Sequence, residues 1–427
     1  MNKKVCMFVW NHFTNDARVL RECTALSEDG YGVDLICIHD PSHKDLPRFE
    51  HRNSNFKIYR VRRYPLLLEL IQKIFKKSTQ NKLLGVLVLL LWGILIYFQP
   101  IIIGALTALA FVFLRTKAKV VWIRGSIILR MIFRGMQGNY SIYHSNDLNT
   151  LPQGYICSKL RWRKRKLIYD SHEVQTSRTG YDSGAYGKSE KFFINKIDSM
   201  IVENHTRAKY NEELYGFYPN VVYNYPFKQK NKQQKKENLQ ELLNIPQEEK
   251  ILLYQGGIQA GRGLDKLIKA AQLFKEGTLV FIGDGRIKPD LEKMVDEMNL
   301  GEKVKFLTKV PVEKLPAYTR NGYIGFQVLN NINYNHYSAS SNKLFEYIMS
   351  DVPVVACSFP EIKKVVEGED IGICVDSHDY QSIANGVNYL LENPAERDKK
   401  AANCKFAKEK YNWEEEKKNF LTVYETI

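Results

Sequence analysis

A chain of 427 residues with a formal net charge of +15 is long enough for two α/β domains, each with its own hydrophobic core. Its seven cysteines, at positions 6, 23, 37, 157, 357, 374 and 404, show no paired metal-ligand spacing. We therefore expect the reduced, buried thiols of a cytosolic protein, which argues against a disulfide framework or a zinc site. No cleavable signal is expected, because residues 1–4 run directly into an apolar strand.

The first 40 residues alternate between strands and a helix. The apolar run Lys4–Trp10 predicts a strand, and Tyr31–Ile38 predicts the next one. Between them a helix begins near Asn15-Asp16, where Asp16 is a plausible cap, and it ends at Asp29-Gly30. This alternation indicates the βαβ units of a parallel sheet.

A basic and apolar segment follows. Between His51 and Asn146 there are 15 Lys and Arg residues against a single acid, Glu69. In its middle, 83–114 is a run of 32 uncharged residues broken at Gln99-Pro100. One helix of that length would reach roughly 48 Å, more than a hydrocarbon core of about 30 Å requires. Pro100 divides it into two arms, each too short to span comfortably.

Both flanks of this run are basic, so the positive-inside rule places both on the cytoplasmic side. The flanking cations are Arg60, Arg62, Arg63, Lys73, Lys76, Lys77 and Lys82 before the run, and Arg115, Lys117, Lys119 and Arg124 after it. We expect residues 83–114 to form a re-entrant hairpin or an in-plane helix pair on an anionic membrane surface. A buried helix pair inside the first domain and a true span are the alternatives.

A second basic cluster, Arg161–Lys166, contains Trp162. Basic residues mixed with an aromatic one are compatible with nucleic acid, but an anionic lipid surface explains them equally well. The neighbouring apolar run favours lipid, so no nucleic-acid partner is expected.

Polar residues end two later strands of the N-terminal half. One strand leads into His144 and Asp147, and the next leads into His172 and Glu173. Polar groups at strand ends are candidates for binding or catalysis, although a histidine there is more often structural. The stretch Val221–Pro226 closes this half.

The segment 227–249 is rich in Lys, Gln, Asn and Glu, which indicates an exposed linker with a short helix at Leu239–Leu243. Strands and glycine turns then alternate with helices. The strand Ile251–Tyr254 ends at Gly256-Gly257 before a helix that opens at Arg262, and the strand Thr278–Ile282 ends in Gly283-Asp284-Gly285.

The stretch Ser340–Met349 predicts a helix, with two serines and an asparagine able to cap it, before a buried strand behind Pro353. A helix start attracts anions, and Lys343 in its first turn suits a phosphate. Glu346, one turn later, can hold the hydroxyls of a ribose. This pattern favours a nucleotide along the helix; an ordinary surface helix with a solvated Lys–Glu pair is the alternative.

In this order the motifs resemble those of the family-4-type retaining glycosyltransferases, the glycosyl transferases group 1, over most of the chain. The resemblance implies the α/β GT-B fold, with two Rossmann-like domains facing a central cleft and residues 83–114 as an apolar membrane-associating insertion. The expected domains are 1–226 on the acceptor side, the linker 227–249, and 250–405 for the nucleotide-sugar. Residues 406–427 are expected to return as a closing helix to the first domain, anchored by Trp413.

The resemblance also implies the site. Its donor-binding residues would be Gly257, Arg262, Asp284, Ser340, Ser341, Asn342, Lys343 and Glu346. Its catalytic candidates would be Asp147, His144, His172 and Glu173. The sequence departs from the family twice, with Gly257 where the family often has a first Arg and Ser338 where it has the sugar-facing glutamate.

The function implied is transfer of a sugar, with retention, from a nucleotide-diphosphate donor to a glycan or lipid-linked acceptor in cell-surface polysaccharide synthesis. A UDP-sugar is favoured over a GDP-sugar, no cofactor is required, and no metal is expected because no Asp-x-Asp motif follows a strand. The protein is expected at the cytoplasmic face of the membrane. A GT-B nucleotide-sugar epimerase and a non-catalytic membrane scaffold are the alternatives.

Overall fold

The computed structural model describes residues 3–427 except 15, 44, 178–183 and 229–235. The chain divides into two compact units. Unit 1 comprises Met1–Asp170 and Phe192–Ser199, and unit 2 comprises Ser171–Lys191 and Met200–Ile427. The predicted Asn15 at the start of the first helix lies outside the described residues.

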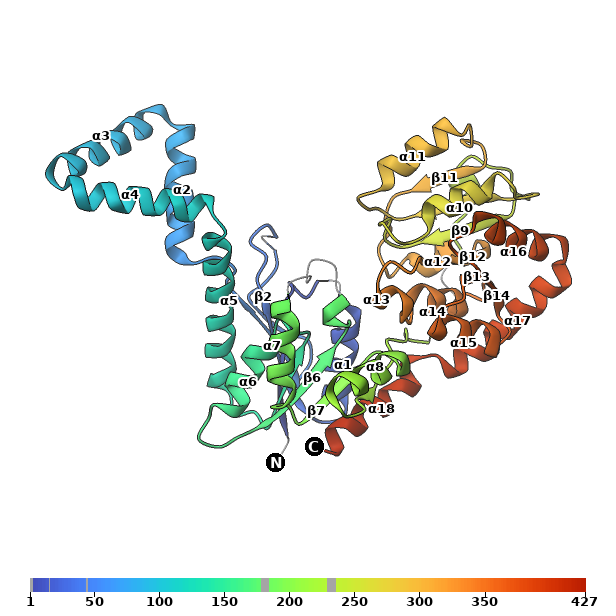
Figure 1. Cartoon of the computed structure of the whole chain (residues 1–427), viewed down its shortest axis with the longest axis horizontal. Helices are drawn as coiled ribbons and strands as arrows, with labels where there is room; N and C mark the ends of the chain where they lie inside the picture. Colours follow the sequence, from blue (N-terminus) through green and yellow to red (C-terminus); the bar gives the residue numbers. More distant parts are fainter. Residues whose placement is uncertain (1–2, 15, 44, 178–183, 229–235) are drawn as a thin grey trace. The chain divides into compact units, whose positions relative to one another are not determined.

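Unit 1 contains a sheet, the helices that cover it and a helical insertion (Figure 1). Its elements are β1 (Lys4–Phe8), α1 (Ala17–Glu28), β2 (Gly32–Ile38), β3 (Phe49–His51), β4 (Phe56–Val61), α2 (Leu66–Gln80), α3 (Lys82–Phe98), α4 (Pro100–Arg115), α5 (Ala118–Gln137), β5 (Ile142–Asn146), α6 (Leu151–Lys159) and β6 (Lys166–Ser171).

The strands of unit 1 run in the order β3-β4-β2-β1-β5-β6, with β3 antiparallel to β4 and every other neighbouring pair in this order parallel. The predicted first strands and helix are confirmed. Asp16 caps α1 by accepting a hydrogen bond from the backbone N–H of Val19 at 3.2 Å. The chain leaves β1 on one side for β2 and returns on the other side at β5, so the polar ends of β1, β5 and β6 share one edge.

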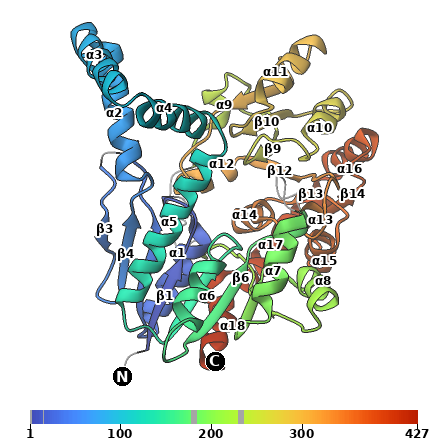
Figure 2. The same cartoon turned by 60° about the vertical axis from the view of Figure 1, so that its left-hand side comes forward.

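The insertion is a pair of apolar helices whose surface is exposed. No described residue of α3 or α4 is buried, and Leu83, Phe98 and Ile101 are 71%, 71% and 85% exposed. The indole of Trp92 donates to the hydroxyl of Thr107 at 3.0 Å and joins the two arms. Figures 1 and 2 show α3 and α4 projecting from α2 and α5, away from the sheet of their own unit. The alternative of a buried helix pair is therefore wrong.

Pro100 is the first residue of α4, so the predicted break between the two arms is confirmed. Among the described residues, no single helix is long and apolar enough to cross a bilayer. One bent pair, Pro100–Phe113 with Ala118–Gln137, meets at 81° and satisfies the criteria of length and composition together.

Helix α5 connects the insertion to the sheet. Its buried residues, Ile127, Met131 and Gly135, lie in the second half of the helix. A Cβ on Gly135 would come within 2.7 Å of the Phe8 ring, so glycine allows α5 to lie close to β1. The hydroxyl of Tyr143 on β5 donates to the carbonyl of Gly135 at 3.0 Å. This half of α5 therefore belongs to the core of unit 1, unlike the exposed arms.

Unit 2 contains a second sheet and most of the remaining helices. The elements from residue 171 onward are η1 (Gln175–Ser177), α7 (Gly184–Ile194), β7 (Ser199–Val202), α8 (His205–Tyr215), β8 (Asn220–Val221), α9 (Leu239–Leu242), β9 (Ile251–Gln255), α10 (Leu264–Ala271), β10 (Thr278–Ile282), α11 (Lys288–Glu297), β11 (Val304–Leu307), α12 (Leu315–Thr319), β12 (Gly322–Gln327), α13 (Tyr334–Tyr337), α14 (Asn342–Met349), β13 (Val354–Cys357), α15 (Pro360–Gly368), β14 (Gly372–Val375), α16 (Tyr380–Glu392), α17 (Pro394–Lys410) and α18 (Trp413–Glu425).

The main sheet of unit 2 is parallel, in the order β11-β10-β9-β12-β13-β14. Every residue of β9, β10 and β13 is buried, as is usual where helices cover both faces of a parallel sheet. The strand order changes direction at β9, which lies between β10 and β12. The carboxyl end of β9 is therefore the topological switch point, where ligands of open α/β sheets bind.

Residues 200–226 pack against the C-terminal region, which explains why the limits of the units differ from the expected domains. The side chain of Asn204 donates to the carbonyl of Ser338 at 2.8 Å, and the hydroxyl of Thr206 donates to Glu361 at 2.6 Å. The predicted short helix of the linker is α9. Part of the predicted linker, 229–235, lies outside the described residues.

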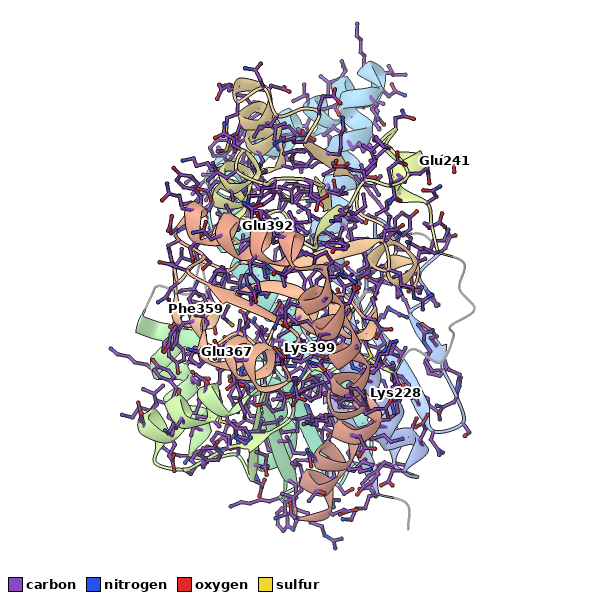
Figure 3. All side chains as sticks on the ribbon, turned by 90° about the vertical axis from the view of Figure 1, so that its right-hand side faces the viewer. Lys228, Glu241, Phe359, Glu367, Glu392 and Lys399 are labelled. Atoms are coloured by element: carbon purple, nitrogen blue, oxygen red, sulfur yellow. The ribbon has the colours of Figure 1, made fainter. Side chains whose placement is uncertain are left out.

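The closing helices carry ion pairs on their surface and aromatic residues inside. Figure 3 shows Lys228 and Lys399 among these side chains; Lys228 pairs with Glu409, and Lys399 lies 3.1 Å from Asp370. Trp413, the predicted anchor, is 3% exposed and its backbone N–H donates to the carbonyl of Pro226 at 2.8 Å. The expected return of this helix to the first domain stays a prediction.

The seven cysteines are free thiols; six are buried and Cys374 is half-buried. Burial raises the pKa of Cys37 to about 12, so this thiol is uncharged at neutral pH. The expectation of buried thiols without disulfides is confirmed.

Candidate functional site

A pocket of about 560 Å³ lies in unit 2, at the carboxyl ends of its central strands. Gly256 follows β9 and Ile282 ends β10, and both line this pocket. All eight predicted donor-binding residues line it as well: Gly257, Arg262, Asp284, Ser340, Ser341, Asn342, Lys343 and Glu346. Residues separated by as many as 89 positions in the sequence thus meet where the strand order reverses.

Two glycines allow the loops of the pocket to approach the neighbouring backbone. Gly263, which begins α10, has φ of +69°, and a Cβ there would lie 2.1 Å from the carbonyl oxygen of Val328. Gly283, after β10, has φ of +157°, and a Cβ there would lie 2.0 Å from the carbonyl oxygen of Gly256. Any larger residue would force the two loops apart, so these turns require glycine.

The start of α14 faces the pocket without a side-chain cap among the described residues. Ser341 occupies the cap position, but its hydroxyl donates to the buried side chain of Gln327 at 2.9 Å. The predicted capping role of the serine is therefore wrong. The backbone N–H groups of the first turn remain oriented for an anion, which the helix dipole also favours.

Lys343 is the central cation of the pocket. Its side chain is buried, and its ammonium lies 5.4 Å from the centre of the Tyr254 ring. A Cβ at position 256 would lie 3.2 Å from Cδ of Lys343, so Gly256 leaves room for the lysine stem. Burial, together with the positive charge of Arg262, lowers the pKa of Lys343 to about 7. An anionic ligand would favour the charged form of this lysine.

Arg262 lies between two glycines with positive φ, Gly261 and Gly263, in the loop after β9. His336 of α13 lines the same pocket, and its Nδ1 lies 3.1 Å from the carbonyl oxygen of Asn330. Burial, and to a smaller extent the charges of Arg262 and Lys343, lowers the pKa of His336. Sequence reasoning missed His336, because a short helix without periodicity gave no signal.

A hydrogen-bond chain orients Glu346. The amide of Gln255 donates to the Glu346 carboxylate at 2.7 Å, and the hydroxyl of Thr319 donates to the amide oxygen of Gln255 at 2.7 Å. Gln255 is fully buried at the end of β9. Gln255 is a second residue that sequence reasoning missed; a polar residue ending an otherwise apolar strand was its only signal.

Asp284 has a different role from that of the cations. Its carboxylate accepts a hydrogen bond from the backbone N–H of Lys309 at 3.0 Å and from the Lys288 ammonium at 3.4 Å. These donors hold the pKa of Asp284 below its ordinary value. The side chain therefore fixes the loop after β11 as one wall of the pocket. The amide oxygen of Asn342, at the start of α14, accepts a hydrogen bond from Asn224 at 3.1 Å.

The predicted catalytic residues separate into two groups. Glu173 lines the pocket, together with Glu203 and Arg207, which the sequence did not suggest. The guanidinium of Arg207 donates to Glu203 at 2.5 Å and to the carbonyl of His172 at 2.6 Å. His172 thus contributes its backbone to the support of Arg207, and a catalytic role for its ring stays a prediction.

Asp147 lies in unit 1, directly after β5, with φ of 63°. Its backbone N–H donates to the carbonyl of Asp170 at 2.8 Å. Left-handed backbone is uncommon outside glycine, and aspartate and asparagine tolerate it best. A residue held in this conformation at a strand end is a candidate for function, so the predicted role of Asp147 stays open.

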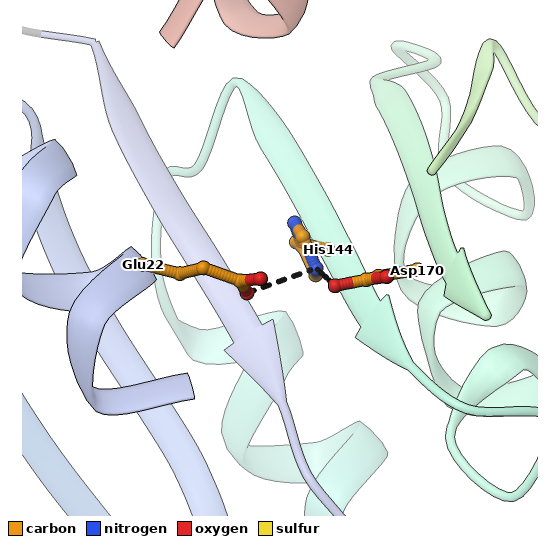
Figure 4. A group of neighbouring side chains, drawn as sticks. All are labelled: Glu22, His144 and Asp170. Carbon is orange, nitrogen blue, oxygen red and sulfur yellow. Dashed lines mark ion pairs between the residues drawn. The ribbon is translucent and has the colours of Figure 1, made fainter. Parts of the chain in front are cut away.

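His144 lies inside unit 1 between two carboxylates (Figure 4). Its Nε2 lies 3.9 Å from Glu22 and 3.8 Å from Asp170, and all three side chains are fully buried. The guanidinium of Arg18 lies 3.0 Å from Glu22 and 2.8 Å from Asp170.

Three potential metal ligands thus lie within 4.8 Å of one another. The guanidinium beside them would repel a metal ion, so we interpret the cluster as an ion-pair network. The imidazole is enclosed in this conformation, and the predicted contact of His144 with the sugar stays a prediction.

The two departures from the family lie close to the pocket. Gly257 lines it without a charge, so Arg262 and Lys343 are the cations at this end. Ser338 is fully buried; its hydroxyl donates to the carbonyl of Tyr334 at 2.7 Å and accepts from Arg207 at 3.2 Å. This serine supports Arg207, whereas the family has a carboxylate at that position.

Known proteins match this chain in two ways. Residues 235–410 match the model of the family described as glycosyl transferases group 1. A D-inositol 3-phosphate glycosyltransferase of Xylanimonas cellulosilytica is 25% identical over 191 residues, which are 44% of this chain and 44% of that protein. The alignment therefore spans less than half the length of this relative.

Two solved structures are similar over the full length. A sucrose-phosphate synthase from Thermosynechococcus elongatus has a TM-score of 0.74 at 16% identity, over 100% of this chain and 99% of that one. Anabaena HepE in complex with UDP has a TM-score of 0.69 at 14% identity, over 100% of both chains. At these identities the likeness establishes the fold, which is GT-B with two Rossmann-like sheets. The region 235–410, which contains the predicted donor-binding residues, matches the glycosyl transferases group 1.

Proposed function

We propose that this protein is a retaining glycosyltransferase that moves a sugar from a nucleotide-diphosphate donor, preferably a UDP-sugar, to a membrane-associated glycan acceptor in cell-surface polysaccharide synthesis. The observation that carries the proposal is the buried Lys343 at the start of α14, beside Arg262 and one turn before Glu346 in a single pocket. A relative named as a glycosyltransferase and a structural neighbour solved with UDP support it.

The chemistry assigned to the pocket is stabilisation of a leaving diphosphate. As the bond between the sugar anomeric carbon and the phosphate oxygen breaks, negative charge grows on the phosphate, and Lys343, Arg262 and the N–H groups of α14 face it. The acceptor oxygen forms the new bond on the same face of the sugar. Its proton passes to the leaving phosphate, so no covalent intermediate with the protein is needed. Glu346 accepts hydrogen bonds from the ribose hydroxyls.

The membrane side of the proposal rests on α3 and α4. Their apolar side chains are exposed over both arms, and an apolar surface of this kind marks a contact with protein or lipid. The basic flanks favour the anionic cytoplasmic leaflet. The acceptor is accordingly a glycan carried at that surface, and the protein acts at the cytoplasmic face.

Nucleotide affinity is expected to weaken as the pH rises above 7. Because the pKa of Lys343 is about 7, the lysine loses its proton over this range in the free protein, whereas a bound diphosphate retains the charged form. If only the charged form binds, UDP affinity falls by up to about 50-fold between pH 7 and pH 9, and the slope approaches tenfold per pH unit at the upper end. Calorimetry with UDP and GDP at several pH values measures this affinity. It should also detect the uptake of a proton when the nucleotide binds above pH 7.

Lys343→Arg is the control, because arginine stays charged over this pH range. Any titration of the nucleotide itself affects this variant and the wild type equally. Its affinity is expected to change less with pH than that of the wild type. Equal pH dependence of UDP affinity in both proteins would mean that Lys343 does not bind the diphosphate. Absence of UDP and GDP binding would favour the membrane scaffold instead.

Glu346→Ala is expected to lower kcat/KM by about two orders of magnitude or more, because it removes the acceptor for the ribose hydroxyls. Gln255→Met keeps the buried volume but removes the donor that orients Glu346, so it should raise the donor KM about tenfold. In the Glu346→Ala background the Gln255→Met change should have little further effect. Gln153→Met, another fully buried glutamine in unit 1, is the control. Additive effects of the two changes would contradict a shared role.

Asp147→Asn is expected to reduce kcat while UDP affinity stays unchanged, if Asp147 contacts the acceptor hydroxyl or the sugar. Asparagine also tolerates positive φ, so the loop is retained. Asp351→Asn in unit 2, where φ is 59°, is the matched control for the backbone effect. Loss of UDP binding in Asp147→Asn would place the residue on the donor side or in the fold instead.

Leu90→Lys is expected to weaken binding to neutral phosphatidylcholine vesicles by about tenfold or more, because a charge in the membrane-facing surface is costly. Leu160→Lys is the matched control, since Leu90 and Leu160 are both 59% exposed but Leu160 lies outside the insertion. UDP affinity should be unchanged in both variants, because the donor pocket lies in unit 2. Equal vesicle binding by the two variants would defeat the proposed attachment.

A further inference from the structure

A second pocket, of about 400 Å³, lies in unit 1 beside α2, the helix that precedes the insertion. Among the described residues, five Lys and Arg line it, and the single acid there is Glu69: the basic residues are Arg48, Arg62, Arg63, Lys73 and Lys76. The guanidinium of Arg62 lies 3.3 Å from Glu69, which leaves four other cations around the cavity. We propose that this basic pocket binds the terminal phosphate or diphosphate of a membrane lipid.

The fold brings these cations together from three segments. Strands β2 and β4 are parallel neighbours, so their carboxyl ends lie side by side, with His39 after one and Arg62-Arg63 after the other. Helix α2 then follows and contributes Lys73 and Lys76. The carbonyl of Arg62 accepts a hydrogen bond from Arg130 of α5 at 2.9 Å, which ties this loop to the helix docked on the sheet.

Helix α2 presents its cations and its apolar residues on opposite faces. Gln72, Lys73 and Lys76 line the pocket at spacings of one to four residues. The opposite face, at positions 67, 70, 71 and 74, carries Leu67, Leu70, Ile71 and Ile74, which are 58%, 54%, 37% and 44% exposed. A basic face opposite an exposed apolar face is typical of a helix at a membrane interface.

The position of the pocket selects a lipid as the occupant. The next helices along the chain are α3 and α4, with their exposed apolar surface, and α2 contacts α3 directly. A free phosphate would need the cations alone and would leave the apolar face of α2 and both arms in contact with water. A membrane lipid satisfies both surfaces, since its phosphate enters the pocket and the hydrocarbon of the surrounding bilayer contacts the apolar helices.

This inference rests on the proposed function where it concerns the acceptor. A glycan joined to a lipid through a diphosphate would be held by that diphosphate in unit 1, which would place the sugar end at a fixed distance from the membrane. Recognition of the carrier phosphate would let the enzyme accept many glycan lengths on one type of carrier.

The test compares two triple variants of the full chain. Arg63→Gln/Lys73→Gln/Lys76→Gln removes three charges from the pocket. Lys77→Gln/Lys82→Gln/Lys117→Gln removes three exposed charges from the same insertion, outside the pocket lining. Binding is measured by flotation with phosphatidylcholine vesicles that contain phosphatidic acid, a terminal phosphate, or phosphatidylglycerol, a phosphodiester. Inorganic diphosphate in solution is the soluble probe.

We expect the wild type to prefer phosphatidic acid to phosphatidylglycerol, and the pocket variant to lose at least about tenfold in affinity for the former. The control variant should retain the preference, although it binds all anionic vesicles more weakly. Arg63→Lys/Lys73→Arg/Lys76→Arg keeps the charges and should restore binding, which excludes a folding defect as the cause.

Equal losses in the pocket and control variants would overturn the proposal in favour of diffuse surface charge. Binding of inorganic diphosphate as tight as binding to phosphatidic acid vesicles would overturn it in favour of a soluble anion. UDP calorimetry on the same samples reports on unit 2. Absence of UDP binding with the lipid preference intact would therefore refute the proposed function alone, and the reverse result would refute this inference alone.

Discussion

The arrangement of the donor pocket depends on one buried cation. Placing the Lys343 ammonium away from water disfavours its charge, and the nearby guanidinium of Arg262 disfavours it further, so the pKa of the lysine falls to about 7. An anion in the pocket would offset both effects and favour the charged form of the lysine. A diphosphate, on which charge grows during glycosyl transfer, gains most from such a site, because the cations need not reorganise as the charge develops.

The surrounding structure keeps this cation and its neighbours in position. The turns at Gly263 and Gly283 pack backbone against backbone, and Gly256 leaves space for the lysine stem. Gln255 and Thr319 orient Glu346, and Gln327 holds the hydroxyl of Ser341 away from the helix start. Each of these supports comes from the end of a strand or from a helix next to it. The strands beneath the pocket are part of a packed core, which supports these residues.

Unit 1 has an apolar core, but it also buries a group of charged residues and exposes an apolar helix pair. Its interior contains Arg18, Glu22, His144 and Asp170, whose opposite charges offset the cost of leaving water. Its insertion exposes Leu, Ile and Phe side chains over two helices, beside a pocket lined by five cations. The exposed apolar helices and the basic pocket are the two surfaces on which the proposed contact with an anionic bilayer rests.

The sequence alone determined the alternation of strands and helices and the break at Pro100, because these features depend on local patterns of apolar, glycine and proline residues. The resemblance to a family pointed to eight residues for the donor, and all eight line one pocket. Tertiary structure decided the rest. The hydroxyl of Ser341 bonds to Gln327 and does not cap the helix. Arg207 and His336 line the pocket, and Gln255 orients Glu346, through contacts between residues distant in sequence. The buried-pair alternative for residues 83–114 failed because burial depends on neighbouring elements. Local pattern cannot report which groups the folded chain brings together, since that is set by strand order and packing.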